Sequence, residues 1–415
     1  MSAPVEEESP DARYHRYLHA VRDEPLPLAL VDLDALERNV ETVVAAASAQ
    51  GKTVRVASKS LRSVDLIARV QGAGGSAVRG VMAYCAAEAS FLATQGMGDL
   101  LIAYPTAHPA DARRIAEANR SGAVVRAVAD ADVHLEALRV AAEAAGVIVP
   151  VVVDVDVSHR MLGGRVHIGV RRSPLHDVDD VVAFVRRVCE TPGLSFAGLQ
   201  AYEAHIAGLA DDPARGLSAG AWFDSATKRA MKRLVRGSLA THRRALVDAL
   251  TRAGIDVLLF NGGGTGSVGL TASEGPITEV AAGSGFLASH LFDRYRSITL
   301  EPAACFALQA VRKPMEGMVT CLGGGFVASG TAGQDRLPQP YLPAGLRLTP
   351  LEGAGEVQTP LLVPHGVDVP LGSPVFFRHA KAGELAEHFN EYLLVRGDRI
   401  VGRALTYRGS GRAFL

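Results

Sequence analysis

The sequence predicts an α/β protein in which a (β/α)8 barrel is followed by an antiparallel β domain. From Val54 to Leu291, short apolar runs alternate with Ala- and Arg-rich segments of helical periodicity, as in repeated strand–helix units. From Ser297 onward, short apolar runs are separated by Gly and Pro turns, as in antiparallel sheets. We therefore assign residues 27–291 to the barrel and residues 292–415 to the β domain.

The number of strands favours a closed barrel over an open sheet, because an open doubly wound sheet needs fewer than the eight apolar runs found. The expected strands are Val54–Ala57, Gly80–Tyr84, Leu100–Tyr104, Ala123–Val128, Ile148–Val155, Phe196–Gln200, Val257–Phe260 and Ile277–Ala281. Helical segments follow most of them, at Ala86–Gln95, Ala110–Asn119, Asp132–Ala145 and Thr227–Ala253.

The segment before the barrel has two parts. Residues 1–26 begin with an acidic, polar stretch that lacks the apolar core of a signal peptide, and we expect them to be partly disordered. The run Leu28–Leu33 and the helix Asp34–Gln50 come before the first barrel strand. The run Leu28–Leu33 is therefore a candidate to pair with the late β domain.

Composition excludes several classes of function. Lys and Arg number 43 against 44 Asp and Glu, so no broad charge favours nucleic acid or a membrane surface. The four cysteines form no zinc-like cluster, and no run of about 20 apolar residues occurs. We expect a cytoplasmic protein that acts on a small molecule and has neither a nucleic acid nor a membrane as partner.

A lysine stands where the first barrel strand ends, in the stretch "VRVASKS". Residues at the carboxyl ends of barrel strands face the active site. Lys59 could be an ordinary solvated lysine, but a cation at a helix start is opposed by the helix dipole. A lysine with a lowered pKa is a better amine nucleophile, so Lys59 is a candidate to form a Schiff base.

Two Gly-rich segments follow the last two barrel strands, "NGGGTGS" at residues 261–267 and "AAGSGF" at residues 281–286. Each could be only a flexible turn. Their position after strands seven and eight is where barrels commonly bind phosphate through backbone N–H groups.

Polar side chains also follow the fifth and sixth expected strands. "VVVDVDVSHRMLGG" supplies Asp154 and Asp156 on one face and then Arg160, and "GLQAYEAHIAG" supplies Gln200, Tyr202 and His205. A lysine opposite a phosphate cradle, with polar groups between them, is the set of contacts that pyridoxal 5′-phosphate (PLP) needs.

These motifs together resemble fold-type III PLP enzymes, and within them the D-threonine aldolase and D-serine dehydratase-like family, whose barrel is that of alanine racemase. The resemblance is carried by "PLALVDLDALERNV", "VASKS", "DVDVSHRMLGGRVHIGV", "GLQAYEAHIAG", "NGGGTGS" and "AAGSGF", and it covers Pro27 to Phe286. It implies the alanine racemase barrel with a C-terminal β domain, PLP as cofactor and a homodimer.

The resemblance also implies roles by position. Lys59 would bind the PLP aldehyde, Arg160 would approach the phenolic oxygen, and Tyr202 would lie near the pyridine nitrogen. Gln200 would be a further cofactor contact, and His205 would lie on the substrate side, sharing proton transfer with Lys59. The phosphate would be held by the amides of Gly263, Gly264, Thr265, Gly283 and Ser284.

The sequence departs from this family near its end. Dehydratase-like members hold a divalent metal on a His-x-Cys or His-x-Asp pair, whereas this chain has His379, Ala380 and Lys381. An ammonium group has no lone pair for a metal. Lys381 could replace the metal as the cation that polarises a β-hydroxyl or a carboxylate, which we favour slightly. Alternatively, a metal could use His379 with Glu384 or His388, or no ion is held.

The resulting expectation is a PLP-dependent lyase that cleaves a β-hydroxy-α-amino acid, of D configuration, into glycine and an aldehyde. Elimination of water to a 2-oxo acid and ammonia is the alternative. Loss of hydroxide benefits more from a Lewis acid, so the broken metal pair favours cleavage. A racemase, which needs a base on each face of the substrate, and a non-catalytic PLP carrier remain further alternatives.

Overall fold

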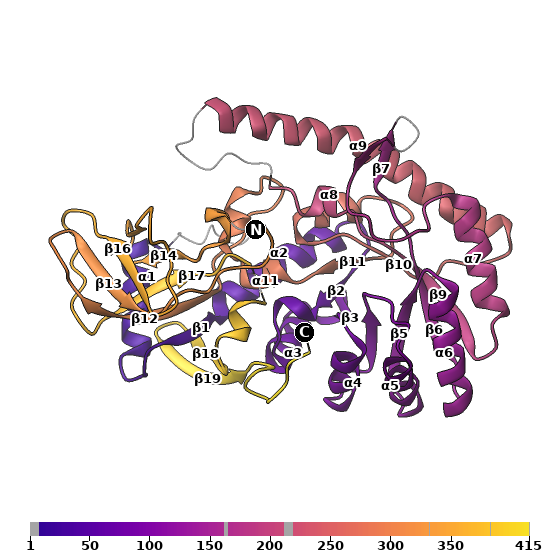
Figure 1. Ribbon diagram of the computed structural model, residues 1–415, viewed down its shortest axis with the longest axis horizontal. Helices are drawn as coiled ribbons and strands as arrows, with labels where there is room; N and C mark the ends of the chain where they lie inside the picture. Colours follow the sequence, from indigo (N-terminus) through magenta and orange to yellow (C-terminus); the bar gives the residue numbers. More distant parts are fainter. Residues whose placement is uncertain (1–7, 162–164, 211–218, 332, 382, 415) are drawn as a thin grey trace.

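The computed structural model describes residues 8–161, 165–210, 219–331, 333–381 and 383–414. In this part of the chain, eight parallel strands close a barrel in the order β10-β11-β2-β3-β4-β5-β6-β9, and a second, mixed sheet lies beside it (Figure 1). The predicted fold class is therefore confirmed. The barrel strands are β2 (Thr53–Ala57), β3 (Val78–Ala83), β4 (Asp99–Ile102), β5 (Val124–Ala129), β6 (Val149–Asp154), β9 (Leu194–Ala201), β10 (Phe260–Gly262) and β11 (Glu279–Ala282).

One barrel strand lies further along the chain than the sequence indicates. The apolar run Val257–Phe260 was the expected strand, but β10 starts at Phe260 and continues into the glycine motif. Asn261 is opposite Gln200 of β9 and Glu279 of β11, and its side-chain amide donates to the Glu279 carboxylate at 2.8 Å. This polar residue is thus held inside the barrel by a partner that hydrophobic patterning does not reveal.

The barrel interior is filled in layers. Near the amino ends of the strands, the Arg55 guanidinium pairs with Glu279 and Asp99, and Asp99 also pairs with Arg126. Above this charged layer, buried apolar side chains of β4, β5 and β6 pack together, namely Leu101, Val128 and Val152. The filled interior leaves the carboxyl ends of the strands as the place for a site, as in other barrels.

Helices surround the barrel because their apolar faces pack on the strands, with side-chain caps at several starts. Asp32 caps α2 by accepting from the amides of Asp34 and Ala35, and Ser63 caps α3. The helices before β9 are α2 (Leu33–Ser48), α3 (Val64–Gly74), α4 (Ala86–Thr94), α5 (Pro109–Arg120), α6 (Asp132–Ala145) and α7 (Val178–Glu190). After β9 come α8 (Ala204–Ala207), α9 (Ala219–Arg252), α10 (Val268–Ala272) and α11 (Ser284–Leu287).

Two features extend over the carboxyl ends of the strands. The hairpin of β7 (His159–Met161) and β8 (Val166–Ile168) interrupts the strand–helix alternation after β6. The helix α9 is 34 residues long and runs past this hairpin, with its amino-terminal half above the barrel (Figure 1). Shorter 3-10 turns join the elements: η1 (Ser58–Ser60), η2 (Gly75–Ala77), η3 (Thr265–Ser267), η4 (His290–Arg294), η5 (Gln334–Arg336) and η6 (Leu385–Glu387).

The second sheet is built from both ends of the chain. Its strand order is β15-β16-β13-β12-β1-β18-β19, with β17 pairing with β12 and β14. The strand β1 (Leu28–Asp32) lies between β12, to which it is antiparallel, and β18, to which it is parallel. The remaining strands are β12 (Ala304–Arg312), β13 (Met318–Leu322), β14 (Gln339–Leu342), β15 (Arg347–Leu348), β16 (Gln358–Leu362), β17 (Pro374–Arg378), β18 (Glu391–Arg396) and β19 (Arg399–Leu405).

The described part of the N-terminal segment forms a helix, while the expectation that residues 1–26 are partly disordered stays a prediction. Residues 1–7 lie outside the described residues, but Pro10–Val21 form the helix α1, capped by Ser9. Tyr14 and Tyr17 are buried against Phe376 of the second sheet, and the Tyr17 hydroxyl donates to Asp32 at 3.0 Å. None of the described helices combines the length and apolar character needed to cross a membrane.

Candidate active site

Lys59 lies at the barrel mouth, in the turn η1 that directly follows β2. Its side chain is exposed, while both of its neighbours in the turn, Ser58 and Ser60, are buried. Ser58 donates to the carbonyl of Met82 on β3 at 2.9 Å, which fixes the turn on the barrel rim. The helix α3 starts only at Val64, so Lys59 belongs to a tight turn rather than to the helix start that the sequence indicated.

The surroundings of Lys59 lower the pKa of its amine. Desolvation by the surrounding protein is the largest cause, and the positive charges of Arg172, Lys381 and Arg62 add to it. Within the described residues, the Lys59 amine has no carboxylate partner. Both effects favour the neutral amine, which is the nucleophilic form.

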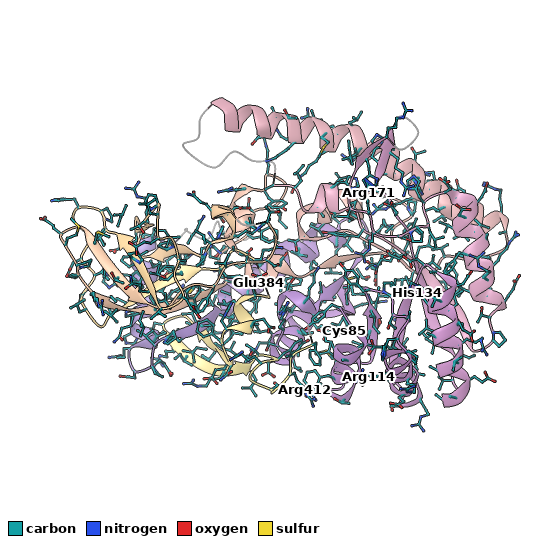
Figure 2. The ribbon with its side chains drawn as sticks, in the orientation of Figure 1. Cys85, Arg114, His134, Arg171, Glu384 and Arg412 are labelled. Atoms are coloured by element: carbon teal, nitrogen blue, oxygen red, sulfur yellow. The ribbon has the colours of Figure 1, made fainter. Side chains whose placement is uncertain are left out.

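The second sheet contributes to the rim beside Lys59. Gly383 has a φ of +94°, and a Cβ added there would come within 2.1 Å of the Lys59 carbonyl oxygen. The segment after β17 therefore passes directly against the lysine turn and needs glycine at this point. Glu384, which Figure 2 shows where the sheet meets the barrel, accepts from the Ser329 amide at 2.6 Å.

The two Gly-rich segments meet on the same rim. The Thr265 hydroxyl accepts from the Gly285 amide at 3.1 Å, which ties η3 to α11. A Cβ added to Gly283 would lie 2.6 Å from the Ala57 carbonyl oxygen, so this loop runs against the strand end that carries Lys59. A Cβ added to Gly264 would approach the Tyr202 ring at 3.4 Å. The loops thus contact both the strand end that carries Lys59 and the ring of Tyr202.

Two amides of the predicted phosphate cradle are already engaged. The Gly263 amide donates to the Glu203 carboxylate at 3.0 Å, and the Gly264 amide donates to the Ser267 hydroxyl at 3.2 Å. The prediction that these two groups bind phosphate is therefore corrected, because each N–H already has a partner inside the loop. The predicted amides of Thr265 and Ser284 lie at the starts of η3 and α11, where N–H groups are left without helical partners.

Beneath the glycine loop lies a buried ion pair that sequence reasoning missed. Glu203 and Arg243 of α9 form a salt bridge with both side chains fully buried. The Glu203 carboxylate also accepts from the hydroxyls of Ser267 and Thr271. Although burial opposes ionisation, the Arg243 charge and these hydroxyls hold the pKa of Glu203 below its ordinary value. The network fixes the shape of the loop from below.

Arg172 lies on the opposite side of the mouth. Its guanidinium donates to Asp154 at 2.8 Å and to the Ala103 carbonyl at 2.7 Å, and it lies 5.9 Å from the centroid of the Tyr202 ring. The side-chain amide of Gln200 donates to the same Ala103 carbonyl at 3.3 Å. Burial raises the pKa of Asp154 to about 6, and the Arg172 charge opposes this rise.

Arg160 lies on the β7–β8 hairpin, where its guanidinium donates to Asp156 at 2.5 Å. Its role at the phenolic oxygen of the cofactor stays a prediction. A second cation, Arg172, lies beside Tyr202, twelve residues later in the chain and beyond the hairpin. Residues 162–164 of the quoted motif lie outside the described residues. The hairpin between Asp156 and Arg172 explains why the sequence analysis did not include Arg172.

His205 lies in α8, on the hairpin side of the mouth. Its Nδ1 would be 3.0 Å from a Cβ added to Gly169, and its buried Nε2 has no hydrogen-bond partner among the described residues. Burial is the largest cause that lowers its pKa, and the nearby Glu203 carboxylate opposes this shift. A neutral imidazole with an unused nitrogen is suited to accept a proton.

His379 is buried, and the residues that could share a metal with it have other contacts. Burial, followed by the charges of Arg378 and His290, lowers the pKa of His379 to about 3. His388 stacks on Phe326 with ring centroids 4.2 Å apart, and Glu384 is engaged by Ser329. Among the described residues, no three His, Cys, Asp or Glu side chains gather in a way that could hold a metal ion. Both buried ring nitrogens of His379 lack a hydrogen-bond partner among the described residues, so a metal at His379 stays a prediction.

Lys381 completes the rim with a positive charge. Its amine donates to the Ser329 carbonyl at 3.3 Å, and it acts on Lys59 electrostatically. Within the described part of the chain, no salt bridge involves Lys381. This cation is therefore available to an anionic group at the mouth.

The sequence analysis missed Arg172, Glu203 and Arg243, for which the sequence gives only weak signals. The signal for Arg172 is Asp154, because a carboxylate at the end of a buried strand needs a cation as partner. Glu203 stands directly after Tyr202, so the alternation that put the phenol in the mouth turned the carboxylate toward the loop. Its partner Arg243 is 40 residues away on α9 and gave no local signal.

The residues at the mouth suit an anionic cofactor that carries an aldehyde. The loop at Gly283 packs against the strand end that carries Lys59, since a Cβ at Gly283 would clash with Ala57 and Ser60. On the other side, the buried Oε1 of Gln200 has no hydrogen-bond partner among the described residues. An unsatisfied buried polar atom that faces a site is commonly satisfied by a ligand.

The chain belongs to the family of the alanine racemase N-terminal domain, whose model matches residues 31–281. This assigns it to the fold-type III PLP enzymes, in agreement with the resemblance found in the sequence. Lys59, Tyr202 and the first Gly-rich loop all fall within the matched residues.

The chain is also similar to particular proteins. A 3-hydroxy-D-aspartate aldolase from Paracoccus denitrificans (strain Pd 1222) is 29% identical over 258 residues, which are 62% of this chain and 59% of that protein. The D-threonine aldolase from Filomicrobium marinum has a similar structure, with a TM-score of 0.77, 21% identity, and coverage of 93% and 95% of the two chains. The D-threo-3-hydroxyaspartate dehydratase from Delftia sp. HT23 follows, with a TM-score of 0.71, 20% identity, and coverage of 93% and 98%.

Proposed function

We propose that this chain is a PLP-dependent lyase that cleaves a β-hydroxy-α-amino acid of D configuration into glycine and an aldehyde. The observation that carries the proposal is the Lys59 amine, which is accessible at the barrel mouth, has a lowered pKa, and faces cations without a described carboxylate partner. The name of the Paracoccus relative, an aldolase for 3-hydroxy-D-aspartate, supports the reaction class.

Several residues would hold the cofactor. Lys59 would bind its aldehyde, and the backbone N–H groups of Thr265 and Ser284 would hold its phosphate. Tyr202 and Arg172 would contact the ring, and the unpaired Oε1 of Gln200 would accept a hydrogen bond. When bound, PLP would supply an electron sink for the bond that breaks at Cα.

The protein groups would move two protons. His205, neutral because its pKa is lowered, would take the proton from the β-hydroxyl group as that oxygen becomes the aldehyde carbonyl. The electron pair of the Cα–Cβ bond would stay on Cα. Lys59, having taken a proton from the ammonium group of the incoming substrate, would then give that proton to Cα to complete glycine.

Lys381 supports a substrate that carries a second carboxylate. It is a cation on the rim with no salt bridge in the described part of the chain, close enough to Lys59 to lower its pKa. A β-hydroxy amino acid with an acidic side chain would place its distal carboxylate against this ammonium group. This interpretation agrees with the hydroxyaspartate named for the Paracoccus relative.

A product assay tests the proposal. The protein, supplied with PLP, is incubated with the stereoisomers of 3-hydroxyaspartate and threonine, and glycine, aldehyde, 2-oxo acid and ammonia are quantified. We expect glycine with glyoxylate or acetaldehyde from D isomers, and none from the Lys59→Ala variant. A 2-oxo acid with ammonia would instead assign elimination of water, and no product from any isomer would contradict a lyase.

The role of Lys381 is tested with the same assay. We expect Lys381→Gln to raise KM for 3-hydroxy-D-aspartate more than for D-threonine, because only the former has a distal carboxylate. Equal effects on the two substrates would contradict this role.

A further inference from the structure

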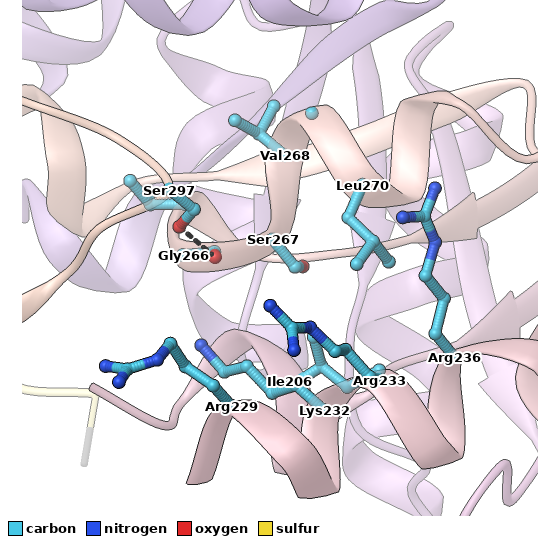
Figure 3. Close-up of a pocket in the computed structure, with 12 residues that line it drawn as sticks. Ile206, Arg229, Lys232, Arg233, Arg236, Gly266, Ser267, Val268, Leu270 and Ser297 are labelled. Carbon is cyan, nitrogen blue, oxygen red and sulfur yellow. Dashed lines mark hydrogen bonds between the residues drawn. The ribbon is translucent and has the colours of Figure 1, made fainter. Parts of the chain in front are cut away.

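A groove on the outer side of the glycine loop is lined by four cations of α9. The cationic groove, as we call it, lies between α9 and the segment η3–α10 and has a volume of about 260 Å³ (Figure 3). Its cations are Arg229, Lys232, Arg233 and Arg236, which face the loop from one side of the helix. Ser297 and Ile206 also line it.

The concentration of charge on this helix face is unusual for the chain. The whole protein has a formal net charge of −1, yet α9 has no Asp or Glu between Ser225 and Val247. The four groove cations are spaced three and four residues apart, which places them together on one helix face. Like charges at these spacings destabilise a helix, and a bound anion would remove that repulsion.

The opposite wall of the groove carries no compensating negative charge among its described residues. Its hydroxyl groups are already engaged: Ser297 donates to the Gly266 carbonyl at 3.0 Å, and Ser267 donates to Glu203 at 2.9 Å. On the cationic side, Arg236 makes a long contact of 3.5 Å with Ser273 and acts on the Glu274 carboxylate electrostatically, and both Arg236 and Arg233 are exposed. The charge of these two arginines is thus open to a ligand.

We propose that the cationic groove is a second anion site, which binds the phosphate group of a small molecule. Arginine guanidinium groups bind phosphate oxygens in bidentate geometry, and two of them here share one groove. The volume suits a phosphate or a small phosphate ester.

The groove adjoins the cofactor cradle and shares one residue with it, Thr265. Lys59, Tyr202 and Ser284 do not occur among its described lining residues. The buried Glu203–Arg243 pair lies behind the groove wall, where the Ser267 hydroxyl donates to Glu203. The inference therefore does not depend on the proposed reaction.

Isothermal titration of the full chain saturated with PLP tests the proposal, with inorganic phosphate and glycerol 3-phosphate as probes in a low-salt, phosphate-free buffer. We expect saturable binding at one site, weakened about tenfold or more in the double variant Arg233→Gln with Arg236→Gln. The matched control, Arg113→Gln with Arg120→Gln, removes two exposed cations from α5 and should bind as the wild type. The probe that binds more tightly shows whether the groove takes free phosphate or a phosphate ester.

Two results would overturn the proposal. Unchanged affinity in the Arg233/Arg236 double variant would show that these arginines hold no anion. Binding that occurs without PLP and vanishes when PLP saturates the chain would place the phosphate in the cofactor cradle instead. Circular dichroism of the double variant guards against loss of fold as the cause of weakened binding.

Discussion

The turn that carries Lys59 (η1) and the first Gly-rich loop (residues 261–267) lie on the same rim of the barrel, but the charged groups at these two places have opposite surroundings. Around the loop, the Glu203 carboxylate is fully buried and satisfied by Arg243, two hydroxyls and an amide. At the turn, the Lys59 amine is accessible and surrounded by cations. The difference separates a scaffold, in which the buried charges are paired, from a reactive amine that has no carboxylate partner among the described residues.

The largest expected effect is on stability, and it comes from removing the buried Glu203 carboxylate. Glu203→Gln removes one of the two carboxylates that pair with the buried Arg243, the other being Glu274, and we expect it to lower the free energy of unfolding by about 3 kcal/mol. The glycine loop would also lose its fixed shape, so the dissociation constant for PLP should rise. Denaturant unfolding and PLP titration measure the two effects.

An exposed ion pair provides the control for this variant. Glu136 pairs with Arg139 on the surface of α6, so Glu136→Gln should leave both stability and PLP affinity unchanged within error. If the two substitutions changed stability equally, the buried network would not be the support that we describe.

The next effect distinguishes the two arginines. Arg172→Gln removes a charge-assisted contact beside Tyr202, and we expect kcat/KM to fall about 10- to 100-fold. Arg160→Gln alters only the hairpin pair with Asp156 and should change kcat/KM much less. A larger loss in Arg160→Gln would restore the residue that the sequence resemblance implied.

The smallest effect concerns the electrostatics of the lysine turn. The Lys381 ammonium disfavours a second positive charge nearby, so Lys381→Gln should raise the pKa of Lys59. Uptake of PLP by the apoprotein requires the neutral amine, and its pH profile should therefore move to higher pH. Lys313→Gln, which removes an exposed cation paired with Asp368, serves as control. An unchanged or lower profile in Lys381→Gln would contradict this coupling.

Active sites of (β/α)8 barrels lie at the carboxyl ends of the strands, and this rule explains which parts of the site could be predicted from the sequence. The carboxyl ends of parallel strands meet at one mouth, so residues directly after apolar runs, such as Lys59, Gln200, Tyr202 and Gly283, could be placed together without a structure. The same alternation identified the barrel, because each of its strands is a short apolar run followed by a helix.

The rule fails where the chain leaves the strand–helix alternation. Arg172 follows a hairpin inserted after β6, and Gly383 reaches the mouth from the second sheet, so neither stands at a strand end. The Glu203–Arg243 pair joins the start of α8 to α9 across 40 residues. Such contacts depend on tertiary packing, which hydrophobic periodicity does not specify.

The central claim is that Lys59 is the amine that binds the cofactor. Reduction of the PLP-treated protein with borohydride, followed by peptide mass mapping, measures this directly. We expect a single stable pyridoxyl adduct on the peptide that contains Lys59, and none in Lys59→Ala. An adduct on Lys381 instead, or no adduct on a folded protein, would contradict the account.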